Sequence, residues 1–407
     1  MDQSDQGPLD GIRVLDCGVF HAGPGGPAIL ADLGAEVIKV EQPGFGDPIR
    51  GVSQMGGVQF GPEGGRSLFF EGANRGKKGI TLDLKAEKGR EVLYRLVEKS
   101  DVFTTNLRPA AVEKLGMGYE RLREINPRLV YAGVSAYGPK GPDREGGGFD
   151  YQGQARSGLM YSVGESDMPP LVSQFGIVDQ ATAIMMSHQV LSALFMRERT
   201  GKGQEVQTSI LSAAMFLQYF NVLVSSVGGT EVPRHQRAKQ NPMRNYFACG
   251  DGRWVMMTLT PPERHWGPLC RAIDRPELEH DPHYDTNAKR DARSEELVRL
   301  FDEIFASRPR AEWLSAFAEH DLFACAVNTL EDLGTDPQVI ANDYIVDFDH
   351  PIFGQIKIPG YPVHFSGAQA GTAQAAPELG QHTDEVLSRL GGYGDEEIEA
   401  LRGEGVI

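Results

Sequence analysis

The chain has 407 residues, enough for two domains with sizeable cores, because single hydrophobic cores stop growing at roughly 250 to 300 residues. Its 40% hydrophobic and 24% charged residues are typical of a globular protein, and the net charge of -16 argues against a nucleic-acid surface, which needs clustered Lys and Arg. No apolar run approaches the roughly 20 residues of a membrane helix, and the acidic, polar residues 1–10 are unlike a signal peptide, so we expect a cytoplasmic protein.

The cysteines form neither a metal-ligand pattern nor a disulfide framework, since they are few and widely spaced: Cys17, Cys249, Cys270 and Cys325. We expect reduced thiols and no metal site.

The N-terminal elements predict a parallel sheet. Residues 12–16 and 36–41 are short apolar runs, and residues 24–33 between them have a helical pattern, which together make a βαβ unit. Glycines then interrupt the periodicity over residues 44–65, which we interpret as a surface loop that orders over a ligand.

The next elements continue this α/β alternation. A helix is expected over residues 84–100, and strands over 102–105 and 130–135. The Gly- and Pro-rich residues 138–148 lead into residues 149–154, which we interpret as an active-site loop, and a strand is expected again at 206–211.

A long helix between Gly176 and Gly201 carries the most informative carboxylate. Its apolar face is formed by Ile184, Met185, His188, Leu191, Leu194 and Phe195, and Gly201 suits a C-terminal cap. Asp179 then lies at a strand-to-helix junction, where free N–H groups favour an ionised carboxylate that can attack without a base. The alternative role for Asp179 is an ordinary N-cap.

The second half of the chain predicts a smaller α/β domain and a returning tail. A polar, basic segment at 228–245 marks a boundary, after which a strand at 254–259 and helices at 295–306 and 310–320 are expected. Beyond residue 331 we expect strands at 344–348 and 355–359 and helices at 383–390 and 395–402. The predicted division is a large domain at 1–225, a small domain at 226–335 and a C-terminal segment at 336–407.

A glycine cluster after the first strand also suggests a nicotinamide-dependent oxidoreductase. Gly23-Pro24-Gly25-Gly26, with Glu41 ending the next strand, imitates a dinucleotide-binding motif. The match is imperfect, because Ala28 occupies the third-glycine position and Pro24 follows the first glycine.

Ordered segments along nearly the whole chain resemble the class III CoA-transferase family, also called the formyl-CoA transferase or carnitine CoA-transferase family. These segments are Pro8-Leu9-Asp10-Gly11-Ile12-Arg13-Val14-Leu15-Asp16, His21-Ala22-Gly23-Pro24, Leu30-Ala31-Asp32-Leu33-Gly34-Ala35-Glu36-Val37-Ile38-Lys39-Val40-Glu41, Asn74-Arg75-Gly76-Lys77-Lys78-Gly79-Ile80-Thr81-Leu82-Asp83-Leu84, Asn106-Leu107-Arg108-Pro109, Leu115-Gly116-Met117-Gly118-Tyr119, Ile125-Asn126-Pro127-Arg128-Leu129-Val130-Tyr131 and Leu379-Gly380-Gln381-His382-Thr383-Asp384-Glu385-Val386-Leu387. The resemblance implies a Rossmann-like large domain with a parallel sheet, a smaller α/β domain and a tail that returns to the large domain. It also implies two interlinked, ring-like subunits in a homodimer, with a hetero-oligomer of related subunits left open.

The resemblance implies that Asp179 is the nucleophile and that CoA is bound as a substrate. His21 stands where several relatives carry a glutamine, so that His21 and Ala22 border the site, although a plain loop histidine is the alternative. The family's CoA-binding loops match segments that contain Arg75, Lys78, Asn106, Leu107, Arg108 and Lys114, where cations would meet the nucleotide phosphates. Ordinary surface charge is the alternative for each of these cations.

The implied reaction moves CoA from an acyl-CoA donor, for example succinyl-CoA, to a free carboxylic acid through an aspartyl anhydride and an enzyme-CoA thioester. Two departures from the family are present. Apart from Gly228-Gly229 no consecutive glycines occur over 228–260, which makes formate or oxalate doubtful substrates, and Gln42 stands where some relatives have arginine, which removes one expected phosphate contact. The α-methylacyl-CoA racemases of the same fold use a Gly-His-Asp segment that reads Gly148-Phe149-Asp150 here, and phenylalanine cannot exchange a proton. A bulky acyl pocket lined by Tyr151, Met160, Tyr161, Met185 and Phe220 competes with plain core packing.

Overall fold

The computed structural model describes residues 6–55, 58–61, 65–229 and 232–407. Residues 1–5 and parts of the segments 44–65 and 228–245, for which we had expectations, lie outside the described residues. The chain divides into two compact units. The first comprises the described residues within 1–160, 172–230 and 346–407, and the second comprises those within 161–171 and 231–345.

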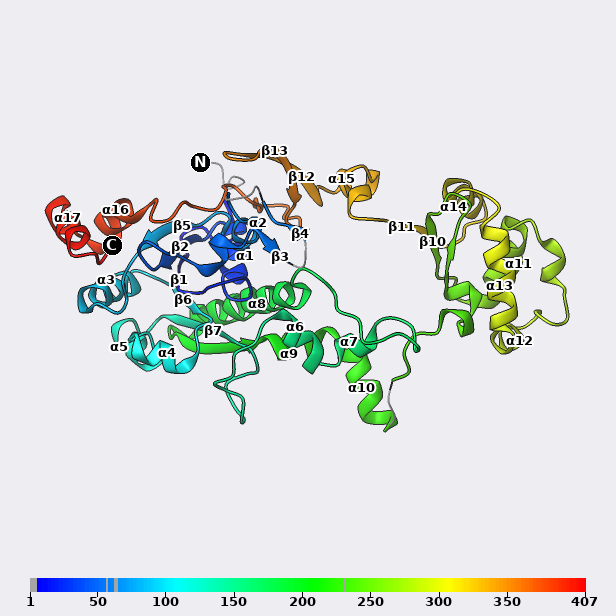
Figure 1. The fold of residues 1–407 in the computed structure, drawn as a ribbon, viewed down its shortest axis with the longest axis horizontal. Helices are drawn as coiled ribbons and strands as arrows, with labels where there is room; N and C mark the ends of the chain where they lie inside the picture. Colours follow the sequence, from blue (N-terminus) through cyan, green and yellow to red (C-terminus); the bar gives the residue numbers. More distant parts are fainter. Residues whose placement is uncertain (1–5, 56–57, 62–64, 230–231) are drawn as a thin grey trace. The chain divides into compact units, whose positions relative to one another are not determined.

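A six-stranded sheet forms the centre of the first unit, and each pair of neighbouring strands in it is parallel (Figure 1). Its strands are β1 (Arg13–Asp16), β2 (Glu36–Glu41), β5 (Lys78–Thr81), β6 (Val102–Thr105), β7 (Val130–Ser135) and β8 (Gln204–Ser209). They lie in the order β5-β2-β1-β6-β7-β8. Renumbered along the chain this is 3-2-1-4-5-6, the doubly wound order, which reverses direction between β1 and β6.

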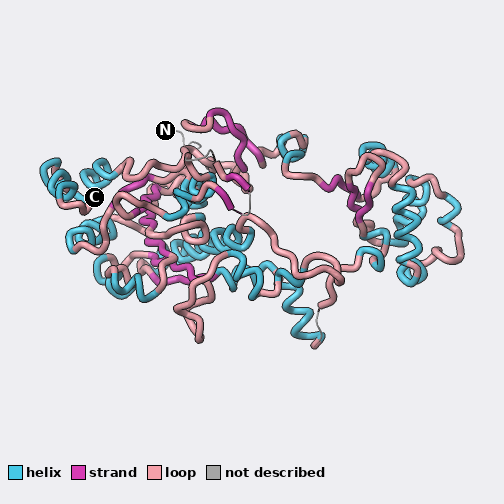
Figure 2. Tube along the Cα trace, viewed as in Figure 1, coloured by secondary structure: helices cyan, strands magenta, loops and turns pink. Residues whose placement is uncertain are grey.

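Helices cover both faces of this sheet, so its inner strands are apolar on both sides (Figure 2). On one face α1 (Gly25–Asp32) and the long α8 (Ile177–Thr200) pack on Val14, Val37 and Val130. On the other face the sheet packs against α3 (Glu87–Glu98), α5 (Tyr119–Ile125) and the C-terminal elements α16 (Thr383–Val386), a π-helical turn (Leu387–Gly391) and α17 (Asp395–Gly403). The C-terminal residues Val386, Leu387, Ile398 and Leu401 belong to that core.

Shorter elements lie in the first unit or cross its chain boundary with the second. These are α2 (Leu68–Asn74), α4 (Pro109–Lys114), α6 (Asp150–Arg156), α7 (Leu159–Ser162), α9 (Ile210–Leu217), α10 (Tyr219–Gly228), a 3-10 turn (Pro48–Gly51) and the two-stranded sheets β3 (Gln54–Met55) with β4 (Val58–Gln59) and β12 (Ile345–His350) with β13 (Gly354–Pro359).

The second unit has its own antiparallel sheet and core. The sheet has the order β11 (Ala324–Val327), β10 (Trp254–Met257), β9 (Tyr246–Ala248). Its helices are α11 (Pro262–Ala272), α12 (Asn287–Ala292), α13 (Ser294–Phe305), α14 (Arg310–Glu319) and α15 (Pro337–Ala341), with 3-10 turns at Arg237–Lys239, Pro242–Arg244, Pro276–Glu279 and Glu331–Gly334. Aromatic side chains such as Phe247, Phe301 and Trp313 fill the core.

The structure corrects three expectations about local structure. The segment 149–154 is not a loop, because α6 begins at Asp150. The last strand, β8, ends at Ser209, where a Ser209 cap starts α9 at Ile210. The segment 44–65 contains a 3-10 turn and two short strands rather than loop alone.

The long helix α8 lies where we expected it, between two left-handed glycines, Gly176 (φ 75°) and Gly201 (φ 71°). Its buried face is a different one, formed by residues such as Ala183, Met186 and Val190 against α1 and the sheet. Ile184 and Phe195, from the expected apolar face, are 50% and 68% exposed. Apolar residues of α8 lie on all sides of the helix, so their spacing alone did not indicate which side is buried.

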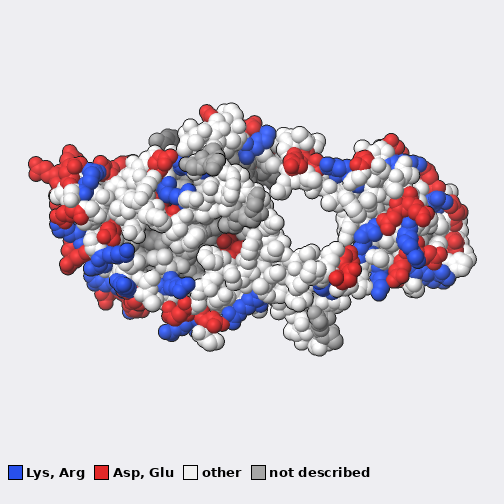
Figure 3. Space-filling model, in the orientation of Figure 1, with Lys and Arg blue, Asp and Glu red and all other residues white. Residues whose placement is uncertain are grey.

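Helix α10 is apolar and exposed. All ten of its residues are described, and none of them is buried. Phe220 and Val227 are 78% and 81% exposed, and Figure 3 shows α10 as a projection without Lys, Arg, Asp or Glu. In the described part of the chain no single helix is long and apolar enough to cross a membrane, whereas α9 and α10 together pass by length and composition but bend by 76°.

Candidate active site

A cavity of about 440 Å³ opens at the carboxyl ends of β1, β6 and β7. This is the point where the strand order reverses, which is where ligands bind in open parallel sheets. Most of its lining residues follow three strands: Val19, Phe20 and Ala22 after β1; Asn106, Leu107, Arg108 and Pro109 after β6; and Ala136, Arg144, Gly146, Gly147, Gly148 and Phe149 after β7. The other lining residues are Val134 and Ser135 at the end of β7, Gln152, Asp179 and Ile210.

The turn after β1 is held by two fully buried ion pairs. Lys77 pairs with Asp16, and Lys39 pairs with Asp47, each at 2.7 Å. Lys39 also donates to the Gly18 carbonyl (2.6 Å), and Asp47 accepts the backbone N–H of Phe20 (3.0 Å). These contacts fix a turn in which Phe20 adopts a left-handed conformation (φ 62°).

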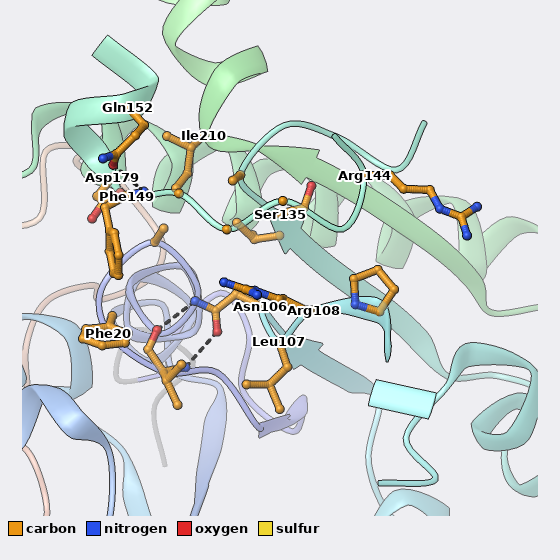
Figure 4. Close-up of a pocket in the computed structure, with 18 residues that line it drawn as sticks. Phe20, Asn106, Leu107, Arg108, Ser135, Arg144, Phe149, Gln152, Asp179 and Ile210 are labelled. Atoms are coloured by element: carbon orange, nitrogen blue, oxygen red, sulfur yellow. Dashed lines mark hydrogen bonds between the residues drawn. The ribbon is translucent and has the colours of Figure 1, made fainter. Parts of the chain in front are cut away.

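Asn106, after β6, fastens the same turn from the other side. Its amide oxygen accepts the N–H of Val19 and its amide nitrogen donates to the Val19 carbonyl, both at 2.8 Å (Figure 4). The side-chain amide of Asn106 is therefore occupied within the protein, while the residue still lines the cavity.

Asp179 is the third residue of α8, so the helix begins after a loop and not directly after a strand as expected. The N-cap is Gly176, and it offers no side chain. A residue from α6 replaces it, because Oδ1 of Asp150 accepts the N–H groups of Val178 (2.7 Å) and Asp179 (3.0 Å). Oδ1 of Asp179 is buried and has no hydrogen-bond partner in the described part of the chain. Asp179 is therefore not the cap of its helix.

The environment of Asp179 raises its pKa to about 7, first through burial and then through the negative charge of Asp150. The expectation that the helix terminus keeps this carboxylate fully ionised at neutral pH was wrong. The N–H groups that would have stabilised the charge are bonded to Asp150 instead, and the same two groups are not free to meet a developing oxyanion.

His21 lies in the turn after β1 and contacts the residue next to Asp179. Its Nε2 donates to Oε1 of Gln180 at 2.9 Å. Burial lowers the pKa of His21, and its Nδ1 is buried without a partner among the described residues. A neutral imidazole at this position suits polar orientation more than charge stabilisation.

The structure gathers only some of the expected CoA-binding residues at the cavity. Ala22, Asn106, Leu107 and Arg108 line it, whereas Arg75, Lys78 and Lys114 do not. Arg75 is paired with Asp32 through both its Nε and Nη2 atoms, and Lys78 is paired with Glu385 at 2.5 Å. Lys114 ends α4.

Three side chains beside Asp179 lie in the segment 149–154 that we expected at the active site, but sequence reasoning assigned them no individual role: Phe149, Asp150 and Gln152. Figure 4 shows Phe149 and Gln152 with Asp179 at one end of the cavity and Arg144 at the other, with Asn106, Leu107 and Arg108 between them. Phe149 also contacts Phe20 edge-on, with ring centroids 5.5 Å apart. The segment Gly148-Phe149-Asp150 indicated a place in the active site. The role of Asp150, however, depends on a contact with a helix that starts 27 residues later, at Ile177.

Comparison with known proteins gives consistent matches over nearly the whole chain. The family model for CoA-transferase family III matches residues 9–383. An acyl-CoA transferase of Fusarium pseudograminearum (strain CS3096) is 35% identical over 410 residues, 99% of this chain and 89% of that protein. The succinyl-CoA:glutarate CoA-transferase of Mus musculus is 32% identical, over 98% of this chain and 90% of that protein. Among solved structures, a CAIB/BAIF family protein from Brucella suis matches with a TM-score of 0.84 and 30% identity, covering 95% of this chain and 100% of that chain.

Proposed function

Because the chain belongs to CoA-transferase family III and is an enzyme of that class, we propose that it moves CoA from an acyl-CoA donor such as succinyl-CoA to a free carboxylic acid, with Asp179 as the nucleophile. The observation that carries the assignment is the carboxylate of Asp179, which lines the cavity at the sheet's reversal point and whose Oδ1 is buried without a hydrogen-bond partner among the described residues. An unbonded carboxylate oxygen is available to attack a carbonyl carbon.

The proposed reaction has four acyl-exchange steps that conserve the free energy of the donor thioester bond. A carboxylate oxygen of Asp179 attacks the donor thioester, the C–S bond breaks, and a mixed anhydride and CoA thiolate form. The thiolate attacks the aspartyl carbonyl and releases the donor acid, which leaves an Asp179-CoA thioester. The acceptor carboxylate then attacks that thioester, its C–S bond breaks, and a second anhydride and CoA thiolate form. The thiolate attacks the carbonyl carbon of the acceptor and releases the new acyl-CoA and the free Asp179 carboxylate. No net proton is taken up or released.

The cavity supports this reaction at both of its ends. Arg108 and Arg144 provide guanidinium groups suited to the phosphates of CoA, away from Asp179. Around Asp179 the lining is mainly apolar, with Phe20, Phe149 and Ile210. We propose that this lining excludes water from the hydrolysable intermediates. Arg75, Lys78 and Lys114 lie outside this cavity, and Arg75 and Lys78 are paired with carboxylates of the chain, so the proposed phosphate contacts are those of Arg108 and Arg144.

Neither alternative reaction gains support from the site. The racemase needs a proton-exchanging group in place of Phe149, whose phenyl ring lies beside Asp179. In the oxidoreductase interpretation the turn after β1 would bind a dinucleotide, but the matches over the chain are to a CoA-transferase family.

Mass spectrometry of the intact protein and of its peptides tests the proposal. Incubation of the enzyme with succinyl-CoA or acetyl-CoA is expected to place a CoA-sized adduct on the Asp179 peptide, and the Asp179→Ala variant is expected to carry none. Transfer activity of this variant should fall by at least about a thousandfold, because a covalent path is lost. CoA transfer at the wild-type rate by Asp179→Ala would refute the assignment.

We also propose that two copies of the chain associate as a homodimer. The support is the exposed apolar surface of α10, since large apolar patches on soluble proteins mark interaction sites. A hetero-oligomer with a related subunit would cover the same surface. The mass of the complex in solution and the masses of its subunits distinguish it from a homodimer.

A further inference from the structure

The start of α8 is capped by a side chain from another helix. In most helices an N-cap Asp, Ser or Asn accepts the N–H groups of the second or third helical residue. Here the N-cap is Gly176, and Oδ1 of Asp150 on α6 accepts those of Val178 and Asp179 at 2.7 and 3.0 Å. Asp150 is only 6% exposed. This buried carboxylate has therefore replaced the local cap.

The carboxylate of Asp150 is itself held in place. Its Oδ2 accepts a hydrogen bond from Nε2 of Gln154 at 2.5 Å. Gln154 is 1% exposed and is anchored in turn by Ser173, whose N–H it accepts (2.9 Å) and to whose carbonyl it donates (2.7 Å). Because both oxygens of Asp150 are bonded, its charge stays fixed beside the first turn of α8.

The Asp179 carboxylate consequently faces a negative charge, and its Oδ1 has no donor among the described residues. The elements packed against α8 are α1, α6, α9, β7 and β8, and α9 has no ionisable residue. The ionisable residues on the others, with the turn before α1, are His21, Asp32, Tyr131, Asp150, Tyr151, Arg156 and Glu205. Of these, Asp150 is the one whose charge, together with burial, raises the pKa of Asp179. His21 is bonded to Gln180 instead.

We propose that Asp150 is a positioning residue for CoA transfer: its oxygen occupies the helix N–H groups that would otherwise bond the Asp179 carboxylate, and its buried negative charge faces that carboxylate, which keeps Asp179 free of those bonds, basic and reactive. The inference rests on the proposed function, in which Asp179 is the nucleophile. A carboxylate bonded to N–H groups is stabilised in its charged form and is a weaker nucleophile. Acylation of Asp179 removes its negative charge, so the repulsion by Asp150 is relieved when the covalent intermediate forms.

The Asp150→Asn variant separates the effect of the Asp150 charge from its capping of the helix N–H groups. Asparagine keeps an oxygen that can accept both N–H groups, but it removes the charge. We expect the acid limb of the pH profile of kcat/KM to move down by about one pH unit and the plateau rate above it to fall by about tenfold. The control is Glu98→Gln, which removes one exposed charge from α3 and should change neither quantity. An acid limb and plateau like those of the wild type would overturn the proposal.

A second measurement follows the protonation of Asp179 directly, without enzymatic turnover. In protein labelled with [4-¹³C]aspartate, the carboxyl signal absent from Asp179→Asn reports the protonation of Asp179. Its titration midpoint should lie at lower pH in Asp150→Asn than in the wild type, and equal midpoints would overturn the proposal even if Asp179 takes up CoA. Failure of the wild type to form a CoA adduct on Asp179 would instead overturn the proposed function and, with it, the reactive role given to Asp150. Thermal unfolding of Asp150→Asn checks that a lower rate does not come from loss of the fold.

Discussion

At the scale of single residues, the raised pKa of Asp179 means that this side chain costs the protein stability. Its pKa rises from an ordinary value of 3.8 to about 7 because the side chain is buried and lies near Asp150. Between these pH values the folded protein binds a proton more tightly than the unfolded chain does. The free energy of unfolding therefore falls as the pH rises from about 4 to 7 and stays lower above that range.

Asp179→Asn should consequently stabilise the protein at pH 8 and have little effect at pH 4. The full pKa difference corresponds to about 4 kcal/mol, and screening at a partly exposed side chain lowers the expected gain to about 2 kcal/mol. Urea unfolding at both pH values measures it. The control Asp167→Asn, at an exposed position, should give no such pH-dependent difference. A gain of the same size at pH 4 and pH 8 would contradict a raised pKa at Asp179.

At the scale of elements, the site depends on the two buried ion pairs that hold β1 and the turn after it. The pairs Lys77–Asp16 and Lys39–Asp47 are fully buried, and Lys77 also donates to the carbonyl of Pro24 (2.8 Å) at the start of α1. Removal of one member of such a pair leaves a buried charge without compensation, which costs far more than breaking a pair at the surface.

We therefore expect Lys77→Met to lower the free energy of unfolding by about 3 to 5 kcal/mol. The matched control is Lys88→Met, which breaks a pair with Glu404 in which both side chains are about half exposed and should cost at most about 1 kcal/mol. Chemical denaturation of both variants gives the comparison. Equal losses of stability would mean that the buried pair does not hold the turn after β1.

Comparison of these elements with the expectations shows where sequence reasoning works. The strands 36–41, 102–105 and 130–135 were predicted with their observed bounds, because strands buried on both faces read as short apolar runs. The ends of α8 were predicted because glycines mark them, but its buried face was not, since packing against α1 and the sheet decides it. Asp179 was singled out from its place near the start of α8, and the family resemblance then favoured the role of nucleophile over that of an N-cap.

The partners of the site residues could not be predicted in the same way. Asp150 meets Val178 across 28 positions of the chain, and Arg75 meets Asp32 across 43, so neither contact has a local sequence signal. For that reason the sequence predicted a phosphate contact for Arg75 and a stabilising contact between the Asp179 carboxylate and the helix N–H groups. Spacing patterns indicate the extent of an element and the end at which a residue lies, and only the packed structure shows which face is buried and which partner a residue has.

At the scale of the whole molecule, the exposed face of α10 is the feature that a single copy of the chain leaves unexplained. A helix with the sequence Tyr219-Phe220-Asn221-Val222-Leu223-Val224-Ser225-Ser226-Val227-Gly228 has no charged residue, and none of its residues is buried. Exposed apolar area costs roughly 25 cal/mol per Å² relative to burial, so association that covers α10 is favoured.

The variant Phe220→Glu should therefore weaken self-association. Phe220 is 78% exposed, so the substitution leaves the fold of the single chain nearly undisturbed, but it places a charge in any interface that covers α10. We expect light scattering after size-exclusion chromatography to give twice the chain mass of 44.5 kDa for the wild type and 44.5 kDa for Phe220→Glu at micromolar concentration, with a dissociation constant raised at least about a hundredfold. Phe220→Leu keeps the apolar contact and should remain a dimer. A wild type of 44.5 kDa, or a Phe220→Glu variant that keeps the doubled mass, would show that a second copy does not cover this helix.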